Sequence, residues 1–294
     1  MKWLSSLRKN KTTCGKVLDL WLEKQEQECS KYHYGACAGV RKNYLADLDD
    51  IPWYDLTPAL VREFRKNWGT PHSANRTLVL LKAAMNWAQS EELIEYNPIA
   101  KVRRLPQEKN VKYVPPRSDV EKVKAACKKN RLALLMAYIH TGGRKQEILQ
   151  LKKKDVHLDG PKPHLTLWTR KKRDRSKTPR TVPVTPELKE ILAPLVSANG
   201  TAYVFAKKNG KPLKNMSRWL PTLCERAGVQ PFQFHSIRHR FAHDMHERKA
   251  PIDDIQQVLG HEDQKTTRIY LSQIVTRHDA VRYMYDQDEA GNDR

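Results

Sequence analysis

The strongest constraint on the fold is a break in the helical pattern near the middle of the chain. The stretch NPIAKVRRLPQEKNVKYVPP, from Asn97 to Pro116, has four prolines and five lysines or arginines, and its apolar residues follow no helical or strand period. Prolines interrupt helices and strand pairing, so this segment is expected to connect two parts that fold separately. We predict a first domain at residues 1–100, a basic linker at 101–116 and a second domain at 117–294.

The first hundred residues have the apolar spacing of α-helices. In TTCGKVLDLWLEKQEQEC, Val17 and Trp21 lie four positions apart and share a helical face. In DLTPALVREFRKNW, Thr57 is the expected cap of a helix that begins at Pro58. In SANRTLVLLKAAMNWAQSEEL, the expected cap is Ser73. We therefore predict an all-helical first domain of about four helices.

The second half of the chain mixes helical and strand patterns. Two β-type runs flank a highly charged turn in HLTLWTRKKRDRSKTPRTVPVT, which predicts a hairpin. A short helix is expected in KQEILQL, directly after the turn TGGR. Further helices are predicted at 118–129 with Ser118 as cap, 131–140, 186–195, 215–227 and 235–248, and from Pro251 to a stop at Gly260. The predicted fold is mainly α with a small antiparallel β-sheet, and this second domain is α+β.

Charge points to a polyanionic partner. Lysine and arginine number 54 against 33 acidic residues, which leaves a formal net charge of +21 at pH 7. Such an excess destabilises a compact chain by self-repulsion, and it is typical of proteins that bind nucleic acid. The basic linker could be a plain tether or part of a clamp around a duplex.

Other classes of protein fit the sequence poorly. Five cysteines are scattered without a CxxC pair, which favours reduced thiols over a disulfide scaffold. No secretory signal is visible, and the most apolar stretch, Leu132 to Ile139, is far shorter than the roughly 20 residues that span a bilayer. We expect that stretch to be a core helix.

A cluster of basic residues in HSIRHRF could serve a metal or a phosphate. His235, His239 and His243 recur every four residues and would line one helical face, as zinc ligands do. A zinc site would need a further ligand and a carboxylate base, and Arg238 would repel the ion. For a phosphodiester, in contrast, Arg238 offers a planar fork and His235 an acid–base group on the same face. The phosphate hypothesis is the stronger one.

Three other segments carry groups that phosphate chemistry needs. In TGGRKQEILQL, Arg144 follows two glycines at a helix start, and Glu147 lies three residues on, where it can orient that arginine. TRKKRDRSKTPR, at the hairpin tip, holds seven lysines or arginines that could contact phosphates or donate a proton to a leaving oxygen. LGHEDQKTTRIY holds His261 and, nine residues later, Tyr270. A tyrosine phenol becomes a competent nucleophile where nearby arginines stabilise its phenolate.

Taken in order, these segments resemble the tyrosine recombinases, and specifically the phage-type site-specific integrases. The family pattern is TGxRxxE, a lysine in a β-hairpin, HxxR, and LGH followed nine residues later by the nucleophilic tyrosine. The match runs from about residue 116 to 275, and four motifs in the same order make it specific. The first half matches only in kind, as a helical core-binding domain. The separate N-terminal arm-binding domain of larger phage integrases is expected to be missing.

The resemblance implies a role for each matched residue. Arg144 and Arg238 would clamp the scissile phosphate, with His235 and His261 assisting, while Tyr270 forms a 3′-phosphotyrosyl link. The proton donor to the 5′-oxygen would be Lys171, with Lys172 as the alternative, and Glu147 would support the site. The expected DNA contacts are Arg170, Lys172, Arg173, Arg175, Lys177 and Arg180 in the hairpin and Arg41, Lys42 and Arg76 in the first domain.

The same resemblance implies double-stranded DNA with specific recombination sites as partner, a tetramer on that DNA, possible accessory DNA-bending factors and no cofactor or metal. The expected setting is a bacterial or phage-encoded cytoplasmic protein at the nucleoid that integrates or excises a phage or other mobile element. Two alternatives stay open. A type IB topoisomerase would use similar chemistry without sequence preference, and a catalytically silent DNA-binding accessory protein would use none.

Overall fold

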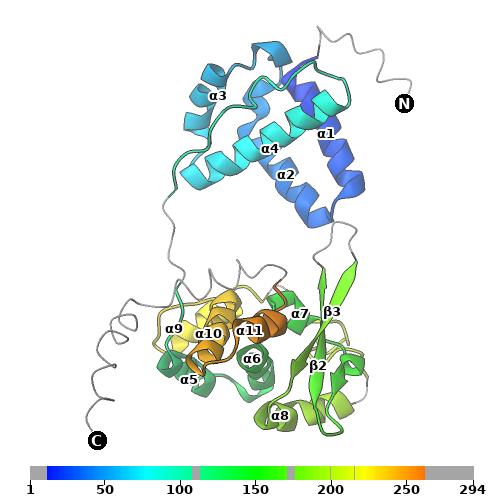
Figure 1. Cartoon of the computed structure of the whole chain (residues 1–294), viewed down its shortest axis with the longest axis vertical. Helices are drawn as coiled ribbons and strands as arrows, with labels where there is room; N and C mark the ends of the chain where they lie inside the picture. The colour runs from blue at the N-terminus through cyan, green and yellow to red at the C-terminus, as the bar shows by residue number, and fades with distance from the viewer. Residues whose placement is uncertain (1–11, 108–112, 171–175, 199, 215, 262–294) are drawn as a thin grey trace, which may run out of the picture. The chain divides into compact units, whose positions relative to one another are not determined.

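The computed structural model describes residues 12–107, 113–170, 176–198, 200–214 and 216–261 (Figure 1). The chain divides into two compact units, Met1–Asn110 and Val111–Arg294. The division falls inside the predicted linker, and each unit has a hydrophobic core of its own. Along the described residues no helix combines the length and apolar character needed to cross a membrane.

The first unit is helical, as predicted. Its α-helices are α1 (Cys14–Glu28), α2 (Lys31–Tyr44), α3 (Pro58–Phe64) and α4 (Pro71–Ser90). Short 3₁₀ turns lie between them at η3 (Ala46–Leu48), η4 (Trp53–Asp55) and η5 (Arg65–Asn67). The apolar face that includes Val17 and Trp21 is buried, which confirms the periodicity of α1.

One of the two predicted helix caps in this unit is confirmed and the other is wrong. Thr57 caps α3, its side chain accepts a hydrogen bond from the amide of Leu60, and Pro58 is the first helical residue. The cap of α4 is Thr70 rather than Ser73. A second proline, Pro71, follows Thr70 and starts the helix one turn earlier, because its missing N–H costs nothing at that position.

The packed part of the first unit extends past residue 100, where we expected the unit to end. Ile99 and Val102 are buried in its core, and Leu105 packs against that core. The side chain of Asn75 donates to the carbonyl of Leu105 at 2.9 Å and accepts from its amide at 2.7 Å. These contacts satisfy backbone groups that a free linker would leave to water.

The second unit is α+β. Its helices are α5 (Arg117–Ala125), α6 (Lys129–Thr141), α7 (Lys145–Leu149), η6 (Lys153–Asp155), α8 (Pro186–Ser197), α9 (Trp219–Arg226), α10 (Phe234–Glu247) and α11 (Ile252–Leu259). Its strands β1 (Val156–His157), β2 (His164–Arg170) and β3 (Lys177–Pro183) form an antiparallel sheet in the order β1-β2-β3. Figure 1 shows the hairpin β2–β3 on one side of this unit and α5, α6, α9, α10 and α11 gathered on the other.

The predicted elements of this unit are present, some with different ends, whereas β1 and η6 were not predicted. The apolar stretch from Leu132 lies in α6, and its central residues are buried, as predicted. Helix α5 begins at Arg117 with Pro116 as its cap instead of Ser118, because the Pro116 carbonyl already accepts from the amides of the first turn. Helix α9 begins at Trp219, later than the predicted residue 215. Every cysteine is free, as expected.

The register of the hairpin decides which side chains face the helices. Leu165 and Leu167 of β2 are buried, and Arg180 of β3 pairs with Leu167. Cross-strand partners point to the same face of a sheet, and so do alternate residues of one strand. Arg180 and Thr169 therefore both belong to the face that packs on the helices.

Candidate active site

Arg144 is the N-cap residue of α7. Two glycines precede it, and Gly142 ends α6 in a left-handed conformation with φ of 57°. A Cβ at Gly142 would lie 2.5 Å from the ring of Phe241, and one at Gly143 would lie 2.6 Å from Ile148. Glycine is thus required twice, for the turn and for close packing. This turn aims the Arg144 side chain, which is 29% exposed, toward the end of α11.

Arg238 projects from α10 toward the same place. Its guanidinium donates to the carbonyl of Gly142 at 2.8 Å and to the carbonyl of Leu259 at 2.6 Å. The residue is only 1% exposed. Because two backbone carbonyls hold its planar fork, the direction of this guanidinium is set by the fold.

The C-terminal end of α11 is where the predicted motifs meet. Helix α11 stops at Gly260, which has a left-handed φ of 64°. His261 follows and is 7% exposed, and its amide donates to the Gln256 carbonyl at 3.1 Å. The Gln256 side chain in turn donates to the carbonyl of His261 at 3.1 Å. Gln256 therefore fixes the backbone of His261 from both directions.

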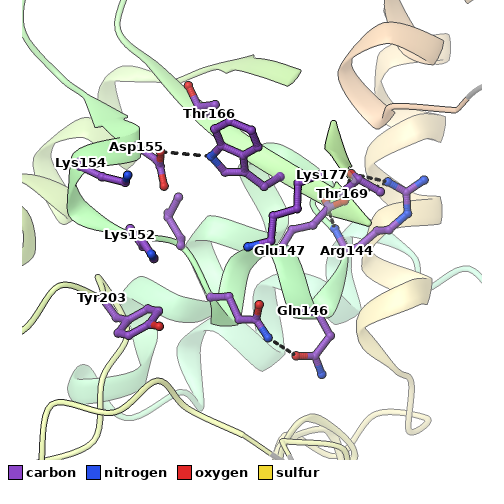
Figure 2. A pocket seen from close by; sticks show the side chains of 13 residues that line it. Arg144, Gln146, Glu147, Lys152, Lys154, Asp155, Thr166, Thr169, Lys177 and Tyr203 are labelled. Carbon is purple, nitrogen blue, oxygen red and sulfur yellow. Dashed lines mark hydrogen bonds and ion pairs between the residues drawn. The ribbon is translucent and has the colours of Figure 1, made fainter. Parts of the chain in front are cut away.

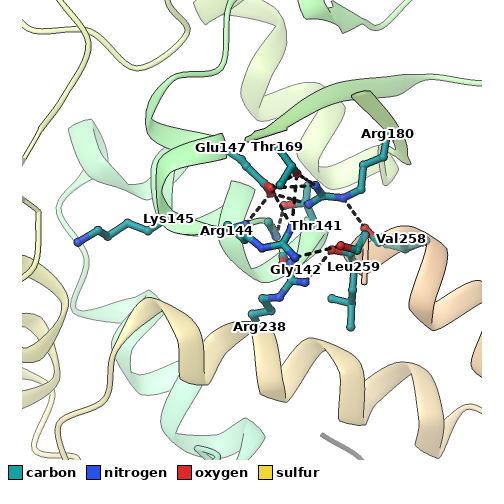
Figure 3. A network of polar contacts seen from close by, with 12 residues as sticks. Thr141, Gly142, Arg144, Lys145, Glu147, Thr169, Arg180, Arg238, Val258 and Leu259 are labelled. Carbon is teal, nitrogen blue, oxygen red and sulfur yellow. Dashed lines mark hydrogen bonds and ion pairs between the residues drawn. The ribbon is translucent and has the colours of Figure 1, made fainter. Parts of the chain in front are cut away.

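Three consecutive carbonyls at this helix end accept hydrogen bonds from three arginines (Figure 3). Arg180 Nε donates to Val258 at 2.8 Å, Arg238 Nη2 to Leu259 at 2.6 Å and Arg144 Nη2 to Gly260 at 3.0 Å. The carbonyl end of a helix carries partial negative charge, so guanidinium groups are favourable there. The arginines come from three different elements, and their meeting defines the site.

Glu147 lies at the centre of the polar network and is 7% exposed. It accepts from both terminal nitrogens of Arg180 at 2.9 and 2.6 Å, from the Arg144 guanidinium at 3.0 Å and from the Arg144 amide at 2.9 Å. The Thr169 hydroxyl donates to it at 2.5 Å. Burial alone would raise the pKa of this carboxyl, but the hydrogen bonds and positive charge of Arg180, with Thr169 and Arg144, lower the pKa from 4.5 to about 2.

We expect Glu147→Gln to lower the free energy of unfolding at pH 7 by roughly 3 kcal/mol, because the folded chain holds the charged carboxylate more favourably than the unfolded chain does. That stabilisation is complete above about pH 4.5, and it is lost as the pH falls through about 2. The difference in stability between wild type and variant should therefore shrink below pH 4.5. Urea denaturation at several pH values measures it.

The control for this prediction is Glu187→Gln. Glu187 pairs with Lys124 at 2.9 Å, but its side chain is 51% exposed, so the loss should be at most about 1 kcal/mol. Equal losses for the two variants would contradict a special role for Glu147.

The two predicted histidines lie in different surroundings, since His261 is buried and His235 is exposed. His235 is exposed in the first turn of α10, three residues before Arg238, and its ring contacts that of His239 at 4.7 Å between centroids.

The zinc alternative gains no support here. In the part of the chain that the structure describes, potential metal ligands group in threes at His243, Asp244 and Glu247, where Arg240 donates to both carboxylates. That guanidinium would repel a metal ion.

An open hollow of about 760 Å³ adjoins Arg144 (Figure 2). Arg144, Glu147 and Thr169 line one part of it, together with exposed Lys177 of β3. Farther along, its lining includes Lys152, Lys154 and Tyr203. The Lys152 ammonium lies 6.0 Å from the centre of the Tyr203 ring. The hollow is thus a surface with four basic side chains that leads directly to Arg144.

Several predicted residues lie outside the described part of the chain. They are the nucleophile Tyr270, the proton donor Lys171 with its alternative Lys172, and the expected DNA contacts Arg173 and Arg175. The backbone of Arg170 ends β2, opposite Lys177. The roles assigned to these residues stay predictions.

Two of the predicted DNA contacts, Arg180 and Arg41, are paired with acidic side chains within the fold. The Arg180 side chain is 9% exposed and is held by Glu147 and Val258, so it faces the protein interior. The Arg41 side chain is 12% exposed and pairs with Asp19 at 3.1 Å and Asp49 at 2.5 Å. Both arginines have acidic partners distant in sequence, which no local pattern reveals. Lys42, Arg76 and Lys177 are exposed, so DNA can reach them without a change in the fold.

The sequence analysis did not select Thr169 or Gln256, which the structure places at the site. Strand alternation could have found Thr169, because it shares the parity of the buried Leu165 and Leu167. The sequence signal for Gln256 was weaker, since a helical glutamine is as common on a solvated face as in a contact with a neighbouring turn. Its contact with His261 depends on how the chain turns after Gly260.

Comparison with known proteins agrees with this geometry. The model of the phage integrase family matches residues 116–276. Tyrosine recombinase XerD of Listeria innocua is 26% identical over 256 residues, which cover 81% of this chain and 84% of that protein. Among solved structures, the Tn1549 transposon integrase in complex with a circular intermediate DNA has a TM-score of 0.75 at 16% identity, covering 94% of this chain and 99% of that one.

A second similar structure is lambda integrase, a dimer bound to a COC′ core site, with a TM-score of 0.73 at 20% identity. It covers 88% of this chain and 95% of that one. At these identities the solved structures establish the shared fold. The family match covers more than half of the 294 residues and includes Arg144, Arg238 and His261. The chain therefore belongs to the phage integrase family, and it is a tyrosine recombinase.

Proposed function

We propose that this recombinase cuts and rejoins duplex DNA at specific sites through a 3′-phosphotyrosyl link to Tyr270, and that it integrates or excises a mobile element. One observation carries the proposal. Arg144 and Arg238, 94 positions apart in the sequence, converge on the adjacent carbonyls of Gly260 and Leu259. Those carbonyls belong to the LGH segment that leads to the tyrosine.

The two arginines are the proposed clamp for the scissile phosphate. Guanidinium forks match the non-bridging oxygens of a phosphate, whose negative charge grows in the transition state. Arg144 lines the basic hollow and is reachable from it. Arg238 is buried, so the surrounding turn must open for a phosphate to reach its guanidinium. His235 and His261 are proposed to hydrogen-bond the phosphate and to assist proton transfer.

Lys171 is the proposed proton donor. The residues of β2 that face the network include Leu167 and Thr169, and position 171 is the next of the same parity. Lys172 has the opposite parity. This alternation supports Lys171 over Lys172, which stands as the alternative.

The proposed reaction is a pair of transesterifications. The Tyr270 oxygen attacks phosphorus as its proton passes to His235 or His261, the phosphotyrosyl bond forms, and the bond to the 5′-oxygen breaks as that oxygen takes a proton from Lys171. A 5′-hydroxyl from a second strand then reverses these steps on a new partner. The phosphotyrosyl bond conserves the energy of the phosphodiester, so no high-energy cofactor is consumed.

The wider DNA contacts are also proposed. They comprise the exposed Lys177 at the hollow, Lys42 and Arg76 in the helical unit, and the hairpin residues Arg170, Lys172, Arg173 and Arg175. We further propose a tetramer on DNA that accessory bending factors can assist. A lambda integrase tetramer bound to a Holliday junction, with a TM-score of 0.71 at 20% identity, is consistent with that assembly.

Trapping on DNA tests the proposal. The protein is incubated with a pool of nicked duplexes cut from mobile-element junctions, and covalently attached DNA is purified under denaturing conditions and sequenced. A site-specific recombinase should return one short shared sequence. Attachment without sequence preference, together with relaxation of supercoiled plasmid, would indicate a type IB topoisomerase instead. Binding without any attachment would indicate an accessory DNA-binding protein.

A further inference from the structure

Arg180 contacts three parts of the second unit, which are helix α11, Glu147 and Thr169 of the β2–β3 hairpin. The proposed reaction needs these parts at fixed positions relative to one another. We propose that Arg180 is a positioning residue for strand cleavage, which holds the end of α11 at a set place relative to Glu147 and the β2–β3 hairpin. This inference rests on the proposed function, because it assigns Arg180 to the site that would cleave DNA. It replaces the DNA-contact role expected from the charge of the hairpin.

The first connection is to α11. Arg180 Nε donates to the Val258 carbonyl at 2.8 Å. Its aliphatic stem also packs on Gly260, where an added Cβ would lie 2.7 Å from Arg180 Cδ. The side chain therefore touches the helix end at two points, one polar and one steric. Val258 and Gly260 flank Leu259, whose carbonyl holds Arg238.

The second connection is to the carboxylate that supports Arg144. Both terminal nitrogens of Arg180 donate to Glu147, one to each oxygen, at 2.9 and 2.6 Å. The same Arg180 Nη1 lies 3.0 Å from the Thr169 hydroxyl, which itself donates to Glu147. Thr169 belongs to β2, so Arg180 links both strands of the hairpin to Glu147.

These connections need the shape of an arginine as well as its charge. The planar fork faces Glu147 with its two terminal nitrogens while Nε faces Val258. A lysine ammonium is a point charge that can neutralise Glu147 but cannot hold both partners in these directions. The Arg180→Lys variant therefore keeps the positive charge that neutralises Glu147 but loses the geometry that positions the end of α11.

A shift of α11 would reach the chemistry directly. The carbonyls of Leu259 and Gly260 are the partners of Arg238 and Arg144, and His261 is the next residue. A displacement of about 1 Å between reacting groups can slow an enzymatic step by about 100-fold. We therefore expect the rate of cleavage to depend on Arg180 even though its side chain faces the protein interior.

The test is single-turnover cleavage of a nicked duplex that carries the sequence recovered by trapping. With DNA saturating, misfolded molecules reduce the final yield of covalent adduct, whereas a mispositioned site reduces the rate constant. We expect Arg180→Lys to lower the rate constant by about 100-fold, with final yield and DNA affinity within about twofold of wild type. Rejoining of the purified adduct should slow by the same factor, because cleavage and rejoining share one transition state.

Arg240→Lys is the matched control. The Arg240 side chain is 12% exposed, compared with 9% for Arg180, and it also pairs with two carboxylates, those of Asp244 and Glu247. It lies in the same unit, and among the described residues its side chain bonds to His243, Asp244 and Glu247 of its own helix. The cleavage rate constant of Arg240→Lys should stay within about twofold of wild type, although this substitution disturbs ion-pair geometry as much as Arg180→Lys does.

A second pair of variants keeps the inference testable if Arg180→Lys folds poorly. Glu147→Gln removes the buried negative charge, and Arg180→Met can then be added without leaving a carboxylate unpaired. If Arg180 only neutralises the charge of Glu147, the double variant should cleave DNA at the same rate as Glu147→Gln alone. A positioning Arg180 predicts a double variant that is slower again by at least about tenfold, with similar thermal stability.

The outcomes separate this inference from the proposed function. If wild type forms no adduct on any duplex, both fail. If wild type forms the adduct and Arg180→Lys changes only the final yield, or matches wild type in rate, Arg180 has no positioning role. The same conclusion follows if the double variant cleaves as fast as Glu147→Gln.

Discussion

Tyr270→Phe is expected to abolish covalent attachment to DNA while DNA affinity stays within about twofold of wild type. The phenol oxygen is the atom that bonds to phosphorus, and phenylalanine removes only that atom, so the loss should be on the order of 10⁴-fold or more. The measurement is the yield of labelled DNA that migrates with protein on a denaturing gel, beside a binding titration on the same duplex.

Two nearby tyrosines supply the controls for this variant. Tyr283 and Tyr285 follow Tyr270 in the chain but lack the spacing from LGH, so Tyr283→Phe and Tyr285→Phe should both form the adduct normally. A normal yield from Tyr270→Phe would refute the assignment of the nucleophile. Adduct formation that EDTA abolishes and added zinc restores would instead support the metal hypothesis.

Arg238→Met is expected to slow cleavage by about 10²–10³-fold, because one guanidinium that stabilises the transition-state phosphate is lost. The same substitution should lower the free energy of unfolding by about 1–3 kcal/mol, since the carbonyls of Gly142 and Leu259 lose their donor in a buried place. Single-turnover cleavage and urea denaturation measure the two effects separately. Arg238→Lys, which keeps the charge without the fork, should fall between wild type and Arg238→Met in rate.

A comparable arginine away from the site provides the reference for that prediction. Arg226 of α9 donates to one carbonyl, that of Ala126, at 2.9 Å and is exposed. Arg226→Met should leave the cleavage rate unchanged and cost at most about 1 kcal/mol of stability. If Arg238→Met lost stability but kept the wild-type cleavage rate, Arg238 would be a structural residue and the clamp would need another member.

Local signals in the sequence succeeded where one residue type has one strong local preference. Thr57 followed by Pro58 identified the start of α3, and glycines at 142 and 260 identified the ends of α6 and α11. The same reasoning failed at Ser73 because a better start, Thr70 with Pro71, lay just upstream. Competing caps a few residues apart differ by fractions of a kcal/mol, and tertiary packing decides between them.

The order of the four motifs was sufficient to place the chain among the tyrosine recombinases, because each motif carries residue types that phosphate transfer requires. Periodicity also placed Arg238 and His235 on one face of a helix. These conclusions needed only relations within a single element, where the geometry of a helix or strand sets which residues are neighbours.

Only the tertiary structure showed the partners of Arg180 and Arg41. Both look like surface charges in the sequence, but Arg180 pairs with Glu147, 33 positions away, and Arg41 pairs with Asp19, 22 positions away. It also showed that the arginines of α10, β3 and the turn before α7 meet on consecutive carbonyls of α11. Sequence periodicity defines the faces of an element, but the partner of each face depends on how distant elements pack. A basic residue beside a predicted DNA-binding hairpin can therefore contact DNA or hold the catalytic site together, and packing alone determines which.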